Sequence, residues 1–220
     1  MKVTFKNIFT ISCALLFFSS VFAEPLNLGL LRKEVQEYHD SGIYEKELND
    51  VIAKAQLYIV SQANEPEASK KKLAIVLDID ETSLSNYDRM AKLHFAANSK
   101  QLQQAILAAD ATAIKPTLVL YNEALKLGIS VFFVTGRDES ALEATKANLQ
   151  NAGYKNWSGL YLRPTSYEQP SIVDFKAQTR ALISKKGYTI IATIGDQYSD
   201  LLGGYAQKEF KLPNPFYFLP

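Results

Sequence analysis

The sequence predicts an α/β fold in which a parallel sheet carries helices on both faces, with a small helical cap inserted after the first strand. Three observations predict this class. Short apolar runs alternate with helical stretches over the second half of the chain. The run Leu73–Ile79 is apolar apart from Asp78, as expected of a strand that is buried on both faces. Residues 86–115 interrupt the alternation directly after that strand, and they show helical propensity alone.

The first 23 residues have the pattern of a cleaved signal peptide. Lys2 and Lys6 form a positively charged start, and the apolar run Ile8–Phe18 is too short to span a bilayer comfortably. Val21 and Ala23 stand at the small-residue positions before the expected cleavage point. We therefore expect export, either to a periplasm or into the medium, with no stable membrane span after processing. An uncleaved anchor or a buried helix is the less favoured interpretation.

The expected mature chain, residues 24–220, has the composition of one globular domain. The full sequence is 47% hydrophobic with a formal charge of +1, so no strong field favours binding to nucleic acid or to a membrane surface. His39 and His94 lie far from other metal-ligating residues, which argues against a histidine-rich zinc site. Cys13 falls in the signal peptide, so the mature protein would lack disulfides and depend on its core. A homo-oligomer is compatible with these features.

Two helices are expected before the first strand. Residues 27–63 show helical spacing of apolar side chains, with a break near Ser41-Gly42 and an end before Pro66. The clearest repeat comprises Leu48, Ile52, Ala55 and Ile59. A polar connector then leads to the strand at Leu73.

The remaining elements follow in alternation. Strands are predicted over residues 129–134, 159–162 and 189–194, and helices over residues 116–127, 139–150 and 172–185. Gly128, Gly153 and Gly187 each follow one of these helices, where a left-handed residue commonly ends a helix. The apolar stretch Phe216–Leu219 could add a last strand.

Acidic and other polar residues follow three of the predicted strands, at the edge of the sheet where α/β proteins bind ligands. They are Asp78 and Asp80 after the first strand, Thr135, Gly136 and Arg137 after the second, and Asp196 and Asp200 after the last. Converging carboxylates repel one another, and a hard cation such as Mg²⁺ relieves this repulsion through oxygen ligands. We expect Asp78 and Asp196 to bind it through their side chains and Asp80 through its backbone carbonyl.

Carboxylates at positions i and i+2 allow a division of labour in phosphate ester hydrolysis. Asp78 would attack phosphorus to form an aspartyl-phosphate, and Asp80 would protonate the leaving alcohol and then activate water. Thr135 and the backbone N–H groups around Gly136 would bind phosphoryl oxygens. A lysine should add positive charge, and Lys176, at the start of a predicted helix, is the best candidate.

Several of these residues also have ordinary structural interpretations. Thr135 could cap a helix, and Arg137 could be a surface or ion-pair residue. Lys185 and Lys186 compete with Lys176 but are typical of solvated charges that end a helix.

Two further assignments remain open on the sequence alone. Asp200 could support the metal site or place a charge at a helix start. In the predicted cap, Tyr87, His94 and Phe95 could contact substrate or only pack the cap against the body.

Four ordered motifs resemble those of the haloacid dehalogenase-like (HAD) phosphatases: Asp78–Thr82, Val134–Arg137, Lys176 and Gly195–Asp200. Longer stretches are similar to subfamily IIIB, the plant-type acid phosphatases related to vegetative storage proteins and to bacterial class B enzymes. These stretches are DIDETSLSN from Asp78, Phe175-Lys176 with Arg180, Gly187-Tyr188, GDQYSDLLG from Gly195, and FKLPNPFYF from Phe210. Tyr198 departs from the tryptophan usual in the plant-type motif, a change expected to affect packing and not chemistry.

The resemblance implies a Rossmann-like fold, magnesium dependence, an acidic pH optimum and hydrolysis of small phosphomonoesters, including nucleotides and aryl phosphates. Two alternatives remain open: a phosphotransferase that uses the same aspartyl-phosphate, and a storage or binding protein on the same scaffold. Some storage proteins of this group lack the first aspartate, and this chain retains Asp78.

Overall fold

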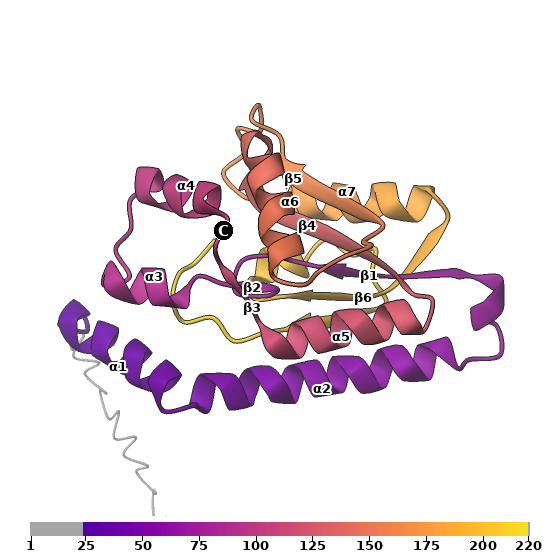
Figure 1. Ribbon diagram of the computed structural model, residues 1–220, viewed down its shortest axis with the longest axis horizontal. Coiled ribbons are helices and arrows are strands. Elements are labelled where there is room, and N and C mark those ends of the chain that lie inside the picture. The colour runs from indigo at the N-terminus through magenta and orange to yellow at the C-terminus, as the bar shows by residue number, and fades with distance from the viewer. Residues whose placement is uncertain (1–23, 220) are drawn as a thin grey trace, which may run out of the picture.

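The computed structural model describes residues 24–219 (Figure 1). The expected signal peptide, residues 1–23, lies outside the described residues. The helices are α1 (Leu28–Asp40), α2 (Ile43–Ala63), α3 (Tyr87–Lys92), α4 (Ser99–Ala108), α5 (Lys115–Lys126), α6 (Leu142–Asn151) and α7 (Val173–Lys185). The strands are β1 (Lys72–Leu77), β2 (Leu84–Ser85), β3 (Thr112–Ala113), β4 (Ser130–Asp138), β5 (Gly159–Arg163), β6 (Tyr188–Gly195) and β7 (Lys208–Lys211). Between residues 24 and 219, no helix is both long and apolar enough to cross a membrane.

A five-stranded parallel sheet forms the centre of the molecule, in the order β5-β4-β1-β6-β7. The predicted α/β class is therefore confirmed. The chain builds outward from β1 through β4 to β5, and it then returns to place β6 on the other side of β1. This reversal creates a switch point beside the carboxyl end of β1, the place where parallel sheets open a crevice for ligands.

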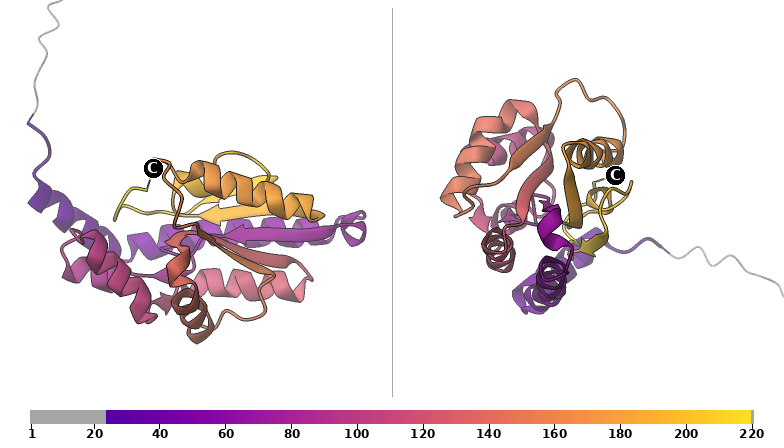
Figure 2. Two further views of the ribbon diagram at one scale, coloured as in Figure 1. Left: turned by 90° about the horizontal axis from the view of Figure 1, so that it is seen from above. Right: turned by 90° about the vertical axis from the view of Figure 1, so that its right-hand side faces the viewer.

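Helices cover both faces of the sheet, as the sequence predicts. Figure 2 shows α7 on the opposite side of the sheet from α2 and α5. Alternate residues of β1 point to the two sides, so Ile75 and Leu77 join the larger hydrophobic cluster with α2, α5 and α6. Ala74 and Val76 join the smaller cluster, which contains Ile183 of α7. Each buried Ile, Leu or Val side chain contributes roughly 1.5–3 kcal/mol.

The N-terminal helices follow the predicted pattern. The break falls at Gly42, which has φ of 83° and separates α1 from α2. Leu48, Ile52, Ala55 and Ile59 are all buried, so the predicted apolar stripe faces the core. The three predicted helix-ending glycines also adopt positive φ, with values of 72° at Gly128, 100° at Gly153 and 89° at Gly187.

The segment expected to form a cap, residues 86–115, carries α3 and α4, and a short strand closes it. That strand, β3, pairs antiparallel with β2, so the expectation of helical structure alone was wrong for Thr112–Ala113. Two residues are too few to produce a periodic apolar signal. In Figure 1, α3 and α4 lie at the end of the sheet where its parallel strands have their carboxyl ends.

The last strand also differs from the expectation. Phe216–Leu219 forms no strand, and the sheet instead ends in β7. The sequence of β7 is Lys-Glu-Phe-Lys, in which only Phe210 is buried, because an edge strand faces solvent. Pro213 and Pro215, which lack a backbone N–H, precede the apolar stretch and disfavour strand pairing there.

Candidate active site

A cavity of about 380 Å³ lies at the carboxyl ends of β1 and β4. Its floor contains five of the predicted site residues: Asp78, Asp80, Thr135, Gly136 and Lys176. Its walls come from two segments that lie far apart in the sequence, residues 86–106 and residues 216–219. The structure thus brings polar groups to the floor of a pocket that has largely apolar walls. Asp196 and Asp200 lie behind this floor, next to Asp78.

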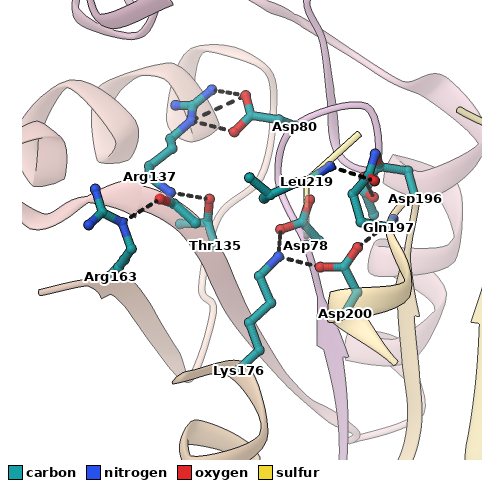
Figure 3. Close-up of polar contacts among 12 residues, drawn as sticks. Asp78, Asp80, Thr135, Arg137, Arg163, Lys176, Asp196, Gln197, Asp200 and Leu219 are labelled. Atoms are coloured by element: carbon teal, nitrogen blue, oxygen red, sulfur yellow. Dashed lines mark hydrogen bonds and ion pairs between the residues drawn. The ribbon is translucent and has the colours of Figure 1, made fainter. Parts of the chain in front are cut away.

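Lys176 lies between the carboxylates of Asp78 and Asp200 (Figure 3). Its Nζ donates to Asp78 Oδ1 at 2.8 Å and also contacts Asp200 Oδ1. The lysine stands in the first turn of α7 and is only 2% exposed. Burial lowers the pKa of Lys176, but the two carboxylates outweigh that effect and raise it above its ordinary value. Lys185 and Lys186 are exposed at the other end of the helix.

Three buried carboxylates meet at the base of the site. One oxygen from each of Asp78, Asp196 and Asp200 lies within 4.8 Å of the others. Burial raises the pKa of Asp78 and of Asp196, and the neighbouring charge of Asp200 raises both further. A divalent cation would offset the repulsion among these buried carboxylates, and a donor set made only of carboxylates suits a hard ion. The residues present therefore fit the cation expected from the sequence, with Asp200 added to the predicted group.

Asp196 is held in place by three hydrogen bonds. Thr82 Oγ1 donates to Oδ1 at 2.9 Å, and Gln197 Nε2 and Asn214 Nδ2 donate to Oδ2 at 2.8 and 2.6 Å. These donors come from the loop after β1, the loop after β6 and the C-terminal segment. One carboxylate thereby ties three parts of the chain together.

Asp200 places its charge at a helix start, one of the two roles that the sequence left open. Its Oδ2 accepts from the backbone N–H of Gln197 at 2.8 Å, which caps the short 3-10 helix Tyr198–Asp200, while its other oxygen faces Lys176. The side chain lies directly against Gly195, where an added Cβ would come within 2.2 Å of Asp200. Only glycine therefore fits at the end of β6.

Asp80 points away from Asp78 and pairs with Arg137 (Figure 3). Arg137 Nη2 lies 2.7 Å from Asp80 Oδ1, and Nε lies 2.9 Å from Oδ2, a bidentate arrangement. Burial raises the pKa of Asp80, but Arg137 outweighs it, so the pKa lies below its usual value. Sequence analysis left Arg137 between a surface and an ion-pair role, and the structure shows the buried ion pair.

Thr135 and Gly136 complete the floor. Thr135 is buried in the second half of β4, and its Oγ1 accepts from the backbone N–H of Arg137 at 3.1 Å. This bond leaves the hydroxyl hydrogen free to donate elsewhere. An added Cβ on Gly136 would lie 3.3 Å from Leu219 Cδ2, so the C-terminal segment passes close above this turn.

The aromatic residues of segment 86–115 divide between two roles. Phe95 lines the cavity, whereas Tyr87 and His94 do not. Tyr87 stacks on His39, with ring centroids 3.2 Å apart, and its hydroxyl donates to Asp40 Oδ1 at 2.8 Å. The packing role therefore applies to Tyr87, which joins the segment to the end of α1.

The sequence did not predict two features of the site. The wall formed by Phe216–Leu219 was expected to be a strand, although the resemblance of FKLPNPFYF to a family motif pointed to this region. Asn86, the last residue of the DIDETSLSN stretch, donates to Asp80 and had been assigned no role. In both cases the contact depends on tertiary placement.

Comparisons with known proteins agree with the resemblance. The sequence matches the family model for HAD superfamily, subfamily IIIB (acid phosphatase), over residues 28–220. The stem 28 kDa glycoprotein of Glycine max is 34% identical over 190 residues, which cover 84% of this chain and 73% of that protein. Acid phosphatase 1 of Solanum lycopersicum is 35% identical over 148 residues, 66% of this chain and 58% of that protein.

Two further relatives define the range of the similarity. Vegetative storage protein 1 of Arabidopsis thaliana is 33% identical over 149 residues, 66% of this chain and 55% of that protein. The chain thus spans less than two thirds of the length of the tomato and Arabidopsis relatives. The structure of the class C acid phosphatase from Bacillus anthracis superposes with a TM-score of 0.72 at 21% identity, covering 87% of this chain and 86% of that one. That similarity shows a shared fold.

Proposed function

The chain belongs to subfamily IIIB of the HAD superfamily, the acid phosphatases, and we propose that it is an exported, magnesium-dependent enzyme that hydrolyses small phosphomonoesters such as nucleotides and aryl phosphates. One observation carries the proposal. The Asp78 carboxylate lies on the floor of a cavity, in contact with a buried lysine and beside two more buried carboxylates. This arrangement suits a nucleophile that must attack an anionic ester.

In the first half of the reaction, an oxygen of Asp78 attacks phosphorus while the bond from phosphorus to the leaving oxygen breaks. Asp80 supplies a proton to that leaving oxygen. Lys176, already in contact with Asp78, places positive charge beside the transferring group. Thr135 donates its hydroxyl hydrogen to a phosphoryl oxygen, together with the backbone N–H groups around Gly136.

In the second half, Asp80 accepts a proton from water, and the water oxygen attacks the phosphorus of the aspartyl-phosphate. The bond to Asp78 breaks, and inorganic phosphate leaves. The N–H groups of Arg137 hold the Asp80 carboxyl at the cavity, where it acts first as acid and then as base. The positive charge of Arg137 favours the ionised form of Asp80, which is the base of this second step.

A magnesium ion would be held by Asp78 and Asp196, with Asp200 in support and the backbone carbonyl of Asp80 as a further ligand. When bound, it supplies positive charge that neutralises the phosphate and the surrounding carboxylates. The fit of the three buried carboxylates supports this assignment.

The proposal is tested by hydrolysis of an aryl phosphate at mildly acidic pH, with magnesium or with excess chelator, beside Asp78→Asn. We expect activity that requires magnesium and falls by at least about 10⁴-fold in Asp78→Asn, because the amide is a poor nucleophile. Wild-type protein that is inactive with every divalent metal would favour the storage or binding alternative.

The phosphotransferase alternative shares every residue named above and differs only in the acceptor. The cavity of about 380 Å³ could accommodate an alcohol beside Asp78. Adding glycerol during hydrolysis of an aryl phosphate separates the two. Release of phosphate equal to release of phenol indicates hydrolysis, and a deficit of phosphate indicates transfer.

Export is proposed from the pattern of the first 23 residues, and the description of two soybean relatives as glycoproteins supports it. Glycosylated proteins pass through a secretory pathway. N-terminal sequencing of the protein recovered from an exporting host should begin at Glu24. A retained Met1 in the exported fraction would contradict the cleavage assignment.

A further inference from the structure

Asn86 lies where the body of the protein passes into segment 86–115. It directly follows β2 and precedes the first residue of α3. Its backbone carbonyl accepts from the N–H groups of Arg89 and Met90, so it occupies the N-cap position of the helix. The next residue, Tyr87, anchors the segment to His39 and Asp40 on α1. Any displacement of this segment would therefore move Asn86.

The side chain of Asn86 does not cap its own helix. Asparagine is among the residues most favoured at an N-cap because its side-chain oxygen accepts from the first free N–H groups. Here the amide Nδ2 instead donates to Asp80 Oδ1 at 2.9 Å and to Glu81 Oε2 at 3.3 Å. The donors are thus directed at two carboxylates beside the cavity.

Asp80 is consequently held from two sides. Arg137 reaches it from β4 in the body, and Asn86 reaches the same Oδ1 from the start of α3. Glu81 reinforces the second contact, because its Oε1 accepts from the backbone N–H of Asn86 at 2.5 Å. The rotamer of Asp80 therefore depends on the position of segment 86–115 as well as on the sheet.

We propose that Asn86 is a positioning residue for the acid/base carboxyl, and that it couples the placement of Asp80 to the placement of the helical segment above the cavity. This inference rests on the proposed function of Asp80. Losing one charge-assisted hydrogen bond of this kind should slow the steps that need Asp80 by about 10- to 100-fold. Steps that do not need Asp80 should be spared.

The test compares Asn86→Ala with the wild type on nitrophenyl phosphate and on glycerol phosphate. Nitrophenolate leaves without protonation, so formation of the aspartyl-phosphate should stay fast while its hydrolysis slows. Rapid mixing should then show a burst of about one nitrophenol per active site. Glycerol needs a proton to leave, so its release should slow by about 10- to 100-fold without a burst, with KM changed less than about threefold.

Asn98→Ala is the matched control. Asn98 caps α4 in the same segment, accepting from the N–H of Gln101 at 2.9 Å, and it should alter both substrates alike without a burst. No burst on nitrophenyl phosphate in Asn86→Ala, a change in KM alone, or unchanged rates would each overturn the inference. If Asn86→Ala does not fold, Asn86→Asp, which has the same shape without the amide donors, is judged by the same criteria. A wild type that hydrolyses neither substrate would overturn the proposed function instead.

Discussion

Within the site, the side chains of Asp78, Asp80 and Lys176 are each held by partners from other parts of the chain. Lys176 lies between Asp78 and Asp200, and Arg137 holds Asp80 with a bidentate geometry that lysine could not reproduce. Removing one member of such a buried pair leaves an uncompensated charge, which costs more than the pair contributes. The residues therefore depend on one another, and single substitutions should not act additively.

Arg137→Ala should lower the free energy of unfolding by about 2–3 kcal/mol, because Asp80 would lose its cationic partner. This loss of stability is at or below the lower limit of that usual for a broken buried ion pair, because the Asp80 side chain is 24% exposed and water can partly solvate its charge. Urea unfolding measures the effect, and Arg89→Ala, which breaks the exposed pair with Asp110, is the control. Equal costs for the two substitutions would contradict the account.

Gly195→Ala should disrupt the acidic group, because the new Cβ would lie 2.2 Å from the side chain of Asp200. Asp200 would have to leave Lys176 and the N–H of Gln197, with a stability cost of about 2–4 kcal/mol and a large loss of activity. Gly187→Ala provides the comparison. Its Cβ meets nothing within 4 Å, so the strain of φ 89° should cost about 1 kcal/mol and leave activity intact.

Among the elements, α7 has two tasks. Lys176 in its first turn enters the site, and Arg180, one turn later, anchors the loop that follows Asp200. The buried Arg180 guanidinium donates to the backbone carbonyls of Asp200 and Gly204, both at 2.8 Å. One helix thus positions a charged group directly and supports a carboxylate through its backbone.

Arg180→Met should therefore reduce activity without touching the cavity, since Arg180 does not line it. We expect a loss of about 10-fold in kcat and about 2–3 kcal/mol of stability, because three or more carbonyl contacts lose their donor. Lys185→Met on the exposed end of α7 is the matched control. Full activity in Arg180→Met would show that the loop holds its conformation independently.

The elements also show how far the sequence predicts the structure. The strands β1, β4 and β6 are predictable because burial on both faces requires continuous apolar runs. β5 is an edge strand, but it is predictable because its residues 160–162 are apolar. β7 escapes prediction because an edge strand carries charge, and β3 because it has only two residues. Phe216–Leu219 misleads in the opposite direction, since its apolar side chains line a cavity and not a sheet.

At the level of the whole molecule, the site depends on the switch point in the sheet. Asp78, Thr135 and Asp196 are separated widely in the sequence and meet because β4 and β6 flank β1. This convergence is predictable, since the carboxyl ends of parallel strands share one edge. The direction in which each side chain points cannot be predicted in this way. The pairing of Asp80 with Arg137 and Asn86 follows from the approach of two other segments, which periodicity does not report.

The most direct test of the account is to trap the covalent intermediate. Wild-type protein is mixed with excess aryl phosphate and magnesium, quenched in acid within milliseconds, digested and analysed by mass spectrometry. The account predicts a phosphate on the peptide that contains Asp78, located at Asp78 by fragmentation, and none in Asp78→Asn. A phosphate on another residue, or turnover by Asp78→Asn at the wild-type rate, would contradict it.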